Sequence, residues 1–133
     1  MSIQNLIQSD VDSITIGCTV GNAITGTCNI TLRRLNNIIT MTISQLFGTA
    51  NGIDNLITIT PSIPIPTQFR PTLPVNPQIN RAIVILNNLV EVIGQVTYSV
   101  NFNTIAIQQL PITVFTGSSG FNSECIFWPV PTL

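Results

Sequence analysis

Catalysis by an acid, a base or a nucleophile requires several titratable side chains in one place, and this sequence of 133 residues contains few of them. It has four basic residues, all of them arginines, five acidic residues and no histidine. Glu91 and Glu124 are the two carboxylates that folding could bring to either side of one glycosidic bond, as a sugar hydrolase requires. Exposed surface carboxylates are the better interpretation, so we expect a protein that is not an enzyme.

The three cysteines, Cys18, Cys28 and Cys125, have no metal-binding spacing and no histidine partner. Cys18 and Cys28 could form a disulfide if a hairpin placed them opposite each other. We expect buried free thiols instead, because cysteine is among the most buried residue types. No glycine-rich phosphate loop follows a strand and opens a helix. The sequence therefore indicates neither a metal nor an organic cofactor.

The four arginines carry more information because the chain has so few charges. Arg33 and Arg34 precede a pair of asparagines, Arg70 lies between Phe69 and a proline, and Arg81 begins an apolar run. In one interpretation, some of them make bidentate contacts with a carboxylate of an adjacent subunit or of an acidic ligand. In the other, they solubilise the surface or pair with a glutamate of the same chain. Both interpretations fit the sequence, and Arg70 is the most interesting candidate because a ring and a proline hold it in place.

Aromatic residues in the second half of the chain could form a platform on which sugar rings stack; they are Tyr98, Phe115, Phe121, Phe127 and Trp128. Packing in the core is the preferred interpretation, most clearly for Phe127, which lies in a predicted strand. Trp128 precedes a proline near the carboxyl end, and we expect it to be exposed or at an interface.

Charged residues make up 7% of the chain and hydrophobic residues 44%, whereas charged residues are about 25% of ordinary soluble domains. An isolated copy would expose much uncharged, strand-forming surface, so we expect neighbouring copies to cover part of it. The net charge of -1 provides no basic patch for nucleic acid. The apolar runs are too short for membrane insertion, and the first residues lack the pattern of a signal peptide.

Apolar and polar residues alternate with a period of two along most of the chain, as in half-buried strands. Turn-forming residues separate these stretches about every 8–12 residues. The predicted strands cover residues 13–20, 27–34, 38–45, 56–60, 79–86, 89–92, 96–102, 105–107, 112–116 and 121–128. This pattern predicts an all-β fold, an antiparallel β-sandwich or jelly roll, formed by residues 13–133, with residues 1–12 as an arm or attachment segment.

A proline-rich segment, residues 60–77, separates two β blocks and holds six of the nine prolines. Because proline lacks an N–H and fixes φ, this segment should be an extended crossover or a run of turns. Each block contains a Leu-Asn-Asn sequence, and residues 36–37 and 87–88 are predicted as hairpin tips. Residues 48–55 and 117–120 should be loops. The strand 79–86 is apolar on both faces and should be buried between layers or against another subunit.

Four segments carry a family resemblance: residues 34–41 (RLNNIITM), 65–71 (IPTQFRP), 94–98 (GQVTY) and 121–128. In this order they resemble the small β-sandwich heads at the carboxyl ends of phage tail fibres, baseplate proteins and other viral surface fibres. These heads are similar to the C1q- and tumour-necrosis-factor-like group of trimeric jelly rolls. The most distinctive part is the Pro-x-x-Phe-Arg-Pro element. The resemblance implies a homotrimer on a fibre tip or capsid surface that binds a host receptor, often a glycan.

The sequence and the resemblance together predict a non-enzymatic viral structural protein on the surface, tail or capsid of a virion. Its expected partners are two further copies of the chain, other virion subunits, and a host glycan or receptor. The alternatives are a minor capsid or cement protein that joins larger capsid subunits without binding a receptor, and a cellular ligand head of the same jelly-roll group. The interface or ligand candidates are Phe69, Arg70 and Pro71, expected at the subunit interface, together with Arg34, Arg81, Tyr98 and Trp128.

Overall fold

The computed structural model describes residues 11–72 and 78–131. Within these ranges the chain forms ten β-strands and one 3-10 turn, and every strand pairing is antiparallel. The prediction of an all-β antiparallel fold is thus confirmed. The elements are β1 (Val11–Asn22), β2 (Gly26–Leu35), β3 (Ile38–Ile43), β4 (Leu46–Thr49), β5 (Ile57–Pro61), η1 (Thr67–Phe69), β6 (Gln78–Asn87), β7 (Val90–Ser99), β8 (Thr104–Gln109), β9 (Ser118–Phe121) and β10 (Glu124–Pro129).

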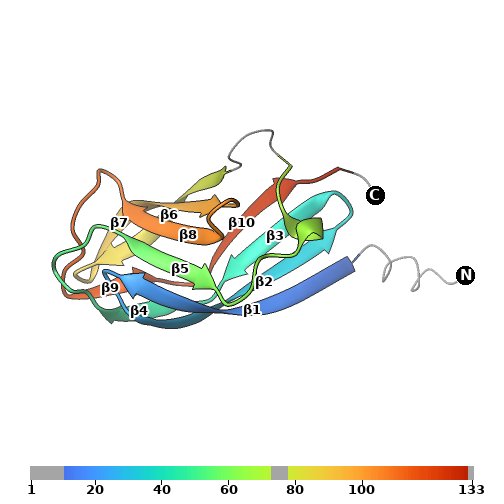
Figure 1. The fold of residues 1–133 in the computed structure, drawn as a ribbon. Coiled ribbons are helices and arrows are strands. Elements are labelled where there is room, and N and C mark those ends of the chain that lie inside the picture. The colour runs from blue at the N-terminus through green and yellow to red at the C-terminus, as the bar shows by residue number, and fades with distance from the viewer. Residues whose placement is uncertain (1–10, 73–77, 132–133) are drawn as a thin grey trace, which may run out of the picture.

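The strands form one curled sheet in the order β10-β3-β2-β1-β5-β8-β7-β6-β9-β4. Because β10 also contacts β6, and β2 contacts β4, the two halves of this sheet lie over each other as the layers of a sandwich (Figure 1). The strands β10, β3, β2 and β1 belong to one layer and β8, β7 and β6 to the other. β5 joins the layers, since it pairs with β1 on one side and with β8 on the other.

The core lies between the layers and is filled by alternate residues of each strand. In β2, for example, Cys28, Ile30 and Leu32 are buried, while the residues between them are exposed. This is the two-residue period that a half-buried strand requires. The largest fully buried side chains are Trp128, Tyr98, Phe69, Phe115 and Phe121.

The two predicted hairpins are present, but one tip is displaced by one residue. Leu35 pairs with Ile38, so residues 36–37 form the first tip as predicted. In the second hairpin Asn87 pairs with Val90, which places the turn at residues 88–89. Figure 1 shows the first tip at the end of the molecule where β1 starts and β10 finishes, and the second tip at the opposite end.

Three expectations for the last third of the chain were wrong. Residues 117–120 are not a loop, because β9 pairs with β4 there, and Gly120 approaches Leu46 so closely that a Cβ would lie 2.0 Å from its carbonyl oxygen. Residues 112–116 form no strand; the amide of Phe115 instead donates to the carbonyl of Asp54 in a neighbouring loop. The final run is divided by a bend between β9 and β10.

The strand β6 is buried on one face within the single chain. Ile83 and Ile85 point into the core, whereas Ala82 and Val84 are exposed, Val84 to 57%. The expectation of burial between two layers of the same chain was therefore wrong, because only one layer covers β6. Of the predicted arm, residues 1–10 lie outside the described residues, and residues 11–12 belong to β1.

Candidate functional site

The proline-rich crossover forms one side of the candidate site. After β5 the chain passes through Ile65 and Pro66 into η1, where the amide of Phe69 donates to the carbonyl of Pro66 at 3.0 Å. The side chains of Phe69 and Pro71 are buried by their own chain. Phe69 and Pro71 therefore anchor the crossover to the sandwich and have little surface left for a partner, whereas Ile63 earlier in the segment is 48% exposed. Residues 73–77 of this segment lie outside the described residues.

The end of β10 fixes the crossover through Trp128. Its indole Nε1 donates to the carbonyl oxygen of Phe69 at 2.9 Å, and its ring lies 5.5 Å from that of Tyr98 between ring centroids. Trp128 is 1% exposed and Phe127 is 53% exposed, so the expectations for these two residues were both wrong. The reason is the strand period: Ile126 and Trp128 point inward, and Phe127 between them points outward.

Arg34, near the end of β2, is 7% exposed and makes three hydrogen bonds to backbone carbonyls. Its Nε donates to Asn36, its Nη1 to Gln68 at 3.0 Å and its Nη2 to Pro131 at 2.8 Å. It therefore joins the β2–β3 tip, the crossover and the segment after β10. A surface role or an intrachain pair with a glutamate was the wrong interpretation for this residue, since neutral carbonyls surround its charge.

Arg70 is half-buried beside this junction. Its Nε donates to the carbonyl of Ile65 at 2.6 Å, which ties both ends of the crossover turn together. Burial raises the pKa of Tyr98 to about 12, and the positive charge of Arg70 opposes that rise.

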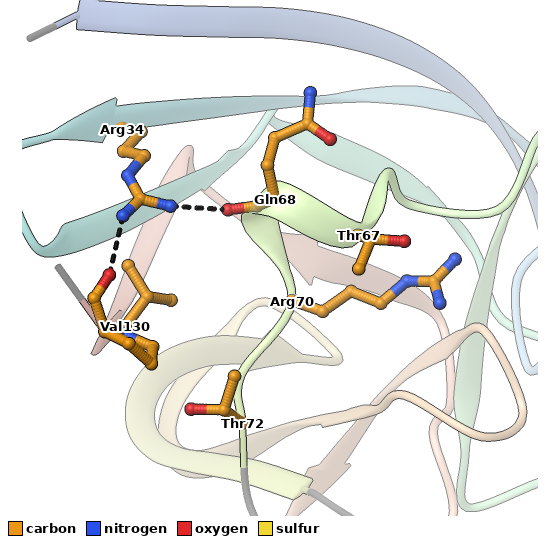
Figure 2. Close-up of a pocket in the computed structure, with 7 residues that line it drawn as sticks. Arg34, Thr67, Gln68, Arg70, Thr72 and Val130 are labelled. Atoms are coloured by element: carbon orange, nitrogen blue, oxygen red, sulfur yellow. Dashed lines mark hydrogen bonds between the residues drawn. The ribbon is translucent and has the colours of Figure 1, made fainter. Parts of the chain in front are cut away.

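A pocket of about 190 Å³ opens between the crossover and the end of β10 (Figure 2). Among the described residues its lining contains two arginines and no carboxylate. Figure 2 shows Arg34 and Arg70 on opposite sides, with the Arg70 guanidinium directed away from Arg34. The described lining residues are Arg34, Thr67, Gln68, Arg70, Thr72, Val130 and Pro131.

The structure brings most of the sequence candidates to this region. Phe69, Arg70, Pro71, Arg34 and Trp128 belong to the crossover or to the two segments that hold it. Tyr98 lies beneath, against Trp128. The lining residues that sequence reasoning missed are Thr67, Gln68, Thr72, Val130 and Pro131. The first three lie within the proline-rich segment, which was the one signal for them, and no feature of the sequence pointed to Val130 and Pro131.

Arg81 lies apart from the pocket, at an exposed position of β6. Its Nη2 donates to the carbonyl of Phe127 at 2.9 Å, and its guanidinium carbon is 5.3 Å from the centre of the Phe127 ring. This arrangement covers the free edge of β10 with a charged side chain, a common protection against edge-to-edge pairing.

The remaining titratable groups form no catalytic arrangement in the described part of the chain. Glu91 is the second residue of β7 and pairs with Leu86, whereas Glu124 begins β10 and pairs with Ile43. Burial raises the pKa of Glu124. Among the described residues no group of histidine, cysteine, aspartate or glutamate could hold a metal ion, and no helix is long and apolar enough to cross a membrane.

The burial of the cysteines agrees with the sequence expectation for two of the three residues. Cys18 and Cys28 lie directly opposite each other in the β1–β2 register, and both are buried free thiols, as expected. A hydrogen bond between them raises the pKa of Cys18 and lowers the pKa of Cys28. Cys125 is exposed, so the expectation of burial was wrong for it, because it lies on the outward side of β10.

No protein-family model matches this sequence, and no curated protein matches it. Among solved structures, the chain is similar to the reovirus attachment protein sigma1, whose crystal structure was determined in complex with alpha-2,3-sialyllactose. The TM-score is 0.53 at 13% sequence identity, over 91% of this chain and 67% of that chain. At this identity the likeness concerns the fold alone. The chain thus has a β fold of the kind found in a viral attachment protein.

Proposed function

We propose that this chain is a non-enzymatic head domain of a viral surface or tail fibre that recognises a host receptor, with a glycan as the favoured receptor class. The observation that carries the proposal is the fold likeness to a viral attachment protein over 91% of the chain. The order of sequence segments that resembles viral fibre heads supports it independently. Location on a virion surface follows from the same two observations and is part of the proposal.

A glycan panel tests the recognition role directly. The purified chain, labelled at the exposed Cys125, is applied to immobilised neutral, sialylated and sulfated glycans. We expect saturable binding to a subset of glycans that share a terminal group. Binding to no glycan, under conditions in which the chain is folded by circular dichroism, would contradict glycan recognition.

We further propose that the head is a homotrimer that uses the outer face of β6, β7 and β8. Val84 pairs with Ile93 across β6 and β7, and the amide of Leu110, just after β8, donates to the carbonyl of Ile93 at 2.9 Å. All three side chains are exposed in the single chain, and they lie next to one another on this outer face. Burial of such a band between copies would remove apolar surface from water. Ile93→Asp should dissociate the assembly, as measured by sedimentation velocity, whereas Leu35→Asp at the exposed β2–β3 tip of the other layer should leave it intact.

A second candidate function is a minor capsid or cement protein. It is favoured by the apolar side chains exposed at the end of the molecule opposite the pocket, on the β6–β7 tip and in the segment after β8; they are Leu89, Val90, Ile112 and Val114. Such a surface suits contact with a larger subunit better than contact with a sugar. This role predicts specific binding to a major capsid protein and no binding on the glycan panel.

A further inference from the structure

We propose that the pocket between Arg34 and Arg70 binds the oxyanion group of an acidic saccharide, a carboxylate or a sulfate ester, through the buried Arg34 guanidinium. This inference rests on the proposed glycan recognition and names the ligand class and its site. It concerns the lining residues Arg34, Thr67, Gln68, Arg70, Thr72, Val130 and Pro131.

The first argument is the charge of Arg34. Arg34 as a whole residue is 7% exposed, and burying a cation is costly unless a counter-charge or several hydrogen bonds compensate it. Here all three partners are neutral carbonyl oxygens. They hold the group rigidly but leave its net charge in place. Within the described residues these bonds use three of its five N–H groups, and the other two would suffice for a bidentate contact with an oxyanion.

The second argument is the surrounding charge. Arg70 adds another positive charge to the lining, and its one hydrogen bond in the described part of the chain uses Nε, so that both terminal nitrogens stay available. The nearest acidic residue in the strand register is Asp12, which pairs with Arg34 across β1 and β2 but does not line the pocket. Among the described residues, therefore, no acidic side chain in the lining offsets the positive charge of the two arginines.

The third argument is the size and polarity of the pocket. About 190 Å³ is below the roughly 300–1,000 Å³ of pockets that enclose drug-sized ligands, so it fits one sugar ring and not an oligosaccharide. Thr67, Thr72 and Gln68 offer hydroxyl and amide groups to sugar hydroxyls, and Val130 and Pro131 offer an apolar wall. A sugar acid has this same combination of an anionic group, hydroxyls and one apolar face.

The experiment compares three probes on the same full chain: sialyllactose, lactose sulfate and lactose. Binding is followed by amide-resolved NMR shifts and by the fluorescence of Trp128, the one tryptophan, whose indole contacts the crossover at Phe69. We expect saturable shifts at residues 67–72 with one or both acidic probes and none with lactose. A preference for sialyllactose would identify the carboxylate as the recognised group, and a preference for lactose sulfate would identify the sulfate.

Matched variants separate a local contact from a general charge effect. Arg70→Gln removes the second positive charge of the lining and should weaken acidic-probe binding by roughly tenfold, because the attraction between this charge and the oxyanion is lost. Arg33→Gln removes the same charge from the neighbouring, exposed position on β2 and should change the affinity less than about twofold. Thr72→Val keeps the shape of an exposed lining residue and should weaken binding in a chain whose fold is undisturbed.

Several results would overturn the inference. Equal binding of lactose and the acidic probes, or shifts confined to residues distant from the pocket, would refute the oxyanion site and leave glycan recognition standing. Equal losses of acidic-probe affinity in Arg70→Gln and Arg33→Gln would show that overall charge, and not a local contact, causes the binding. Binding of other glycans on the panel without binding of either acidic probe would also refute the site. If no glycan on the panel binds, the proposed function is refuted as well.

Discussion

The same tripeptide, Leu-Asn-Asn, forms a hairpin tip at each end of the molecule, and the two tips differ by one residue in register. At the first tip Leu35 pairs with Ile38, and Asn36 has a positive φ of 55°. At the second tip the pairing continues through Asn87, and the positive φ values fall on Asn88 and Leu89, at 52° and 65°. Leu89 is thereby placed in a conformation that leucine rarely adopts.

Tertiary hydrogen bonds explain the difference. At the second tip the Asn87 amide nitrogen donates to Gln109 at 2.7 Å and to the carbonyl of Val114 at 3.0 Å, and its amide oxygen accepts from Thr116 at 3.0 Å. These bonds hold Asn87 in the strand and displace the turn. At the first tip, the backbone carbonyls of Asn36 and Asn37 are the acceptors, for Arg34 and for the amide of Val130. Local sequence thus determines that a turn forms, and distant partners determine its register.

The largest effect should come from the residue that holds the first tip. Arg34→Met leaves three carbonyls without their charged donor, and we expect a loss of about 3 kcal/mol or more in the free energy of unfolding. Urea unfolding followed by Trp128 fluorescence measures it. Arg33→Met on the exposed face should stay within about 0.5 kcal/mol of the wild type. Similar losses in both variants would show that Arg34 is not the link between the tip, the crossover and β10.

Asn87→Ala should produce the next largest effect. It removes three hydrogen bonds at the second tip, with an expected loss of about 2 kcal/mol in the same unfolding measurement. Asn37→Ala at the first tip is the matched control and should cost well under about 1 kcal/mol, since the contact described there uses its backbone. The explanation of the register shift fails if the two substitutions cost the same.

Leu89→Gly should stabilise the second tip. Leu89 is 72% exposed, so little packing is lost, and Asn-Gly is the preferred pair for a two-residue turn with positive φ at both positions. We expect a gain of about 0.5–1 kcal/mol, after the entropy that glycine adds to the unfolded chain. Asn37→Gly, at a position without positive φ, should give no gain. A loss in Leu89→Gly would indicate that its side chain already packs against a partner copy.

The smallest effect concerns Glu124, at the opposite end of β10 from Trp128. Its pKa is raised by burial, so the folded state binds the proton more tightly than the unfolded state, and stability falls as the pH rises through the raised value. Glu124→Gln should therefore stabilise the chain at pH 7 by less than about 1 kcal/mol, and the difference should vanish near about pH 3. Urea titrations at the two pH values test this; a benefit that is larger in acid would have the wrong sign.

The fold was largely predictable because a period of two is visible wherever one strand face is buried. Residues 27–34 and 38–45 alternate in this way and form β2 and β3. The period does not reveal which face points inward, and for this reason Phe127 and Trp128 were assigned in the wrong order. We predicted a loop at residues 117–120 because a glycine-serine sequence gives no indication of a strand by itself. The strand forms there because β9 pairs with β4.

Two residues of the candidate site could be predicted from the sequence, and the other residues that line the pocket could not. The rarity of charge drew attention to Arg34 and Arg70, and both line the pocket. The sequence could not show that Arg34 is buried, because its partners are backbone carbonyls of Gln68 and Pro131, which lie 34 and 97 residues away. In the sequence nothing distinguishes Thr67 and Thr72 from other polar residues, because only the folded crossover places them beside β10.

The solution mass of the purified chain tests the fibre-head proposal most directly, because that proposal attributes the low charge and the exposed face of β6, β7 and β8 to association of copies. Light scattering behind a sizing column gives this mass without reference to shape. The account predicts a stable species at three times the chain mass of 14.4 kDa. A monomer at 14.4 kDa that persists at high protein concentration would contradict it, and the search would then turn to a larger capsid subunit that covers the same face.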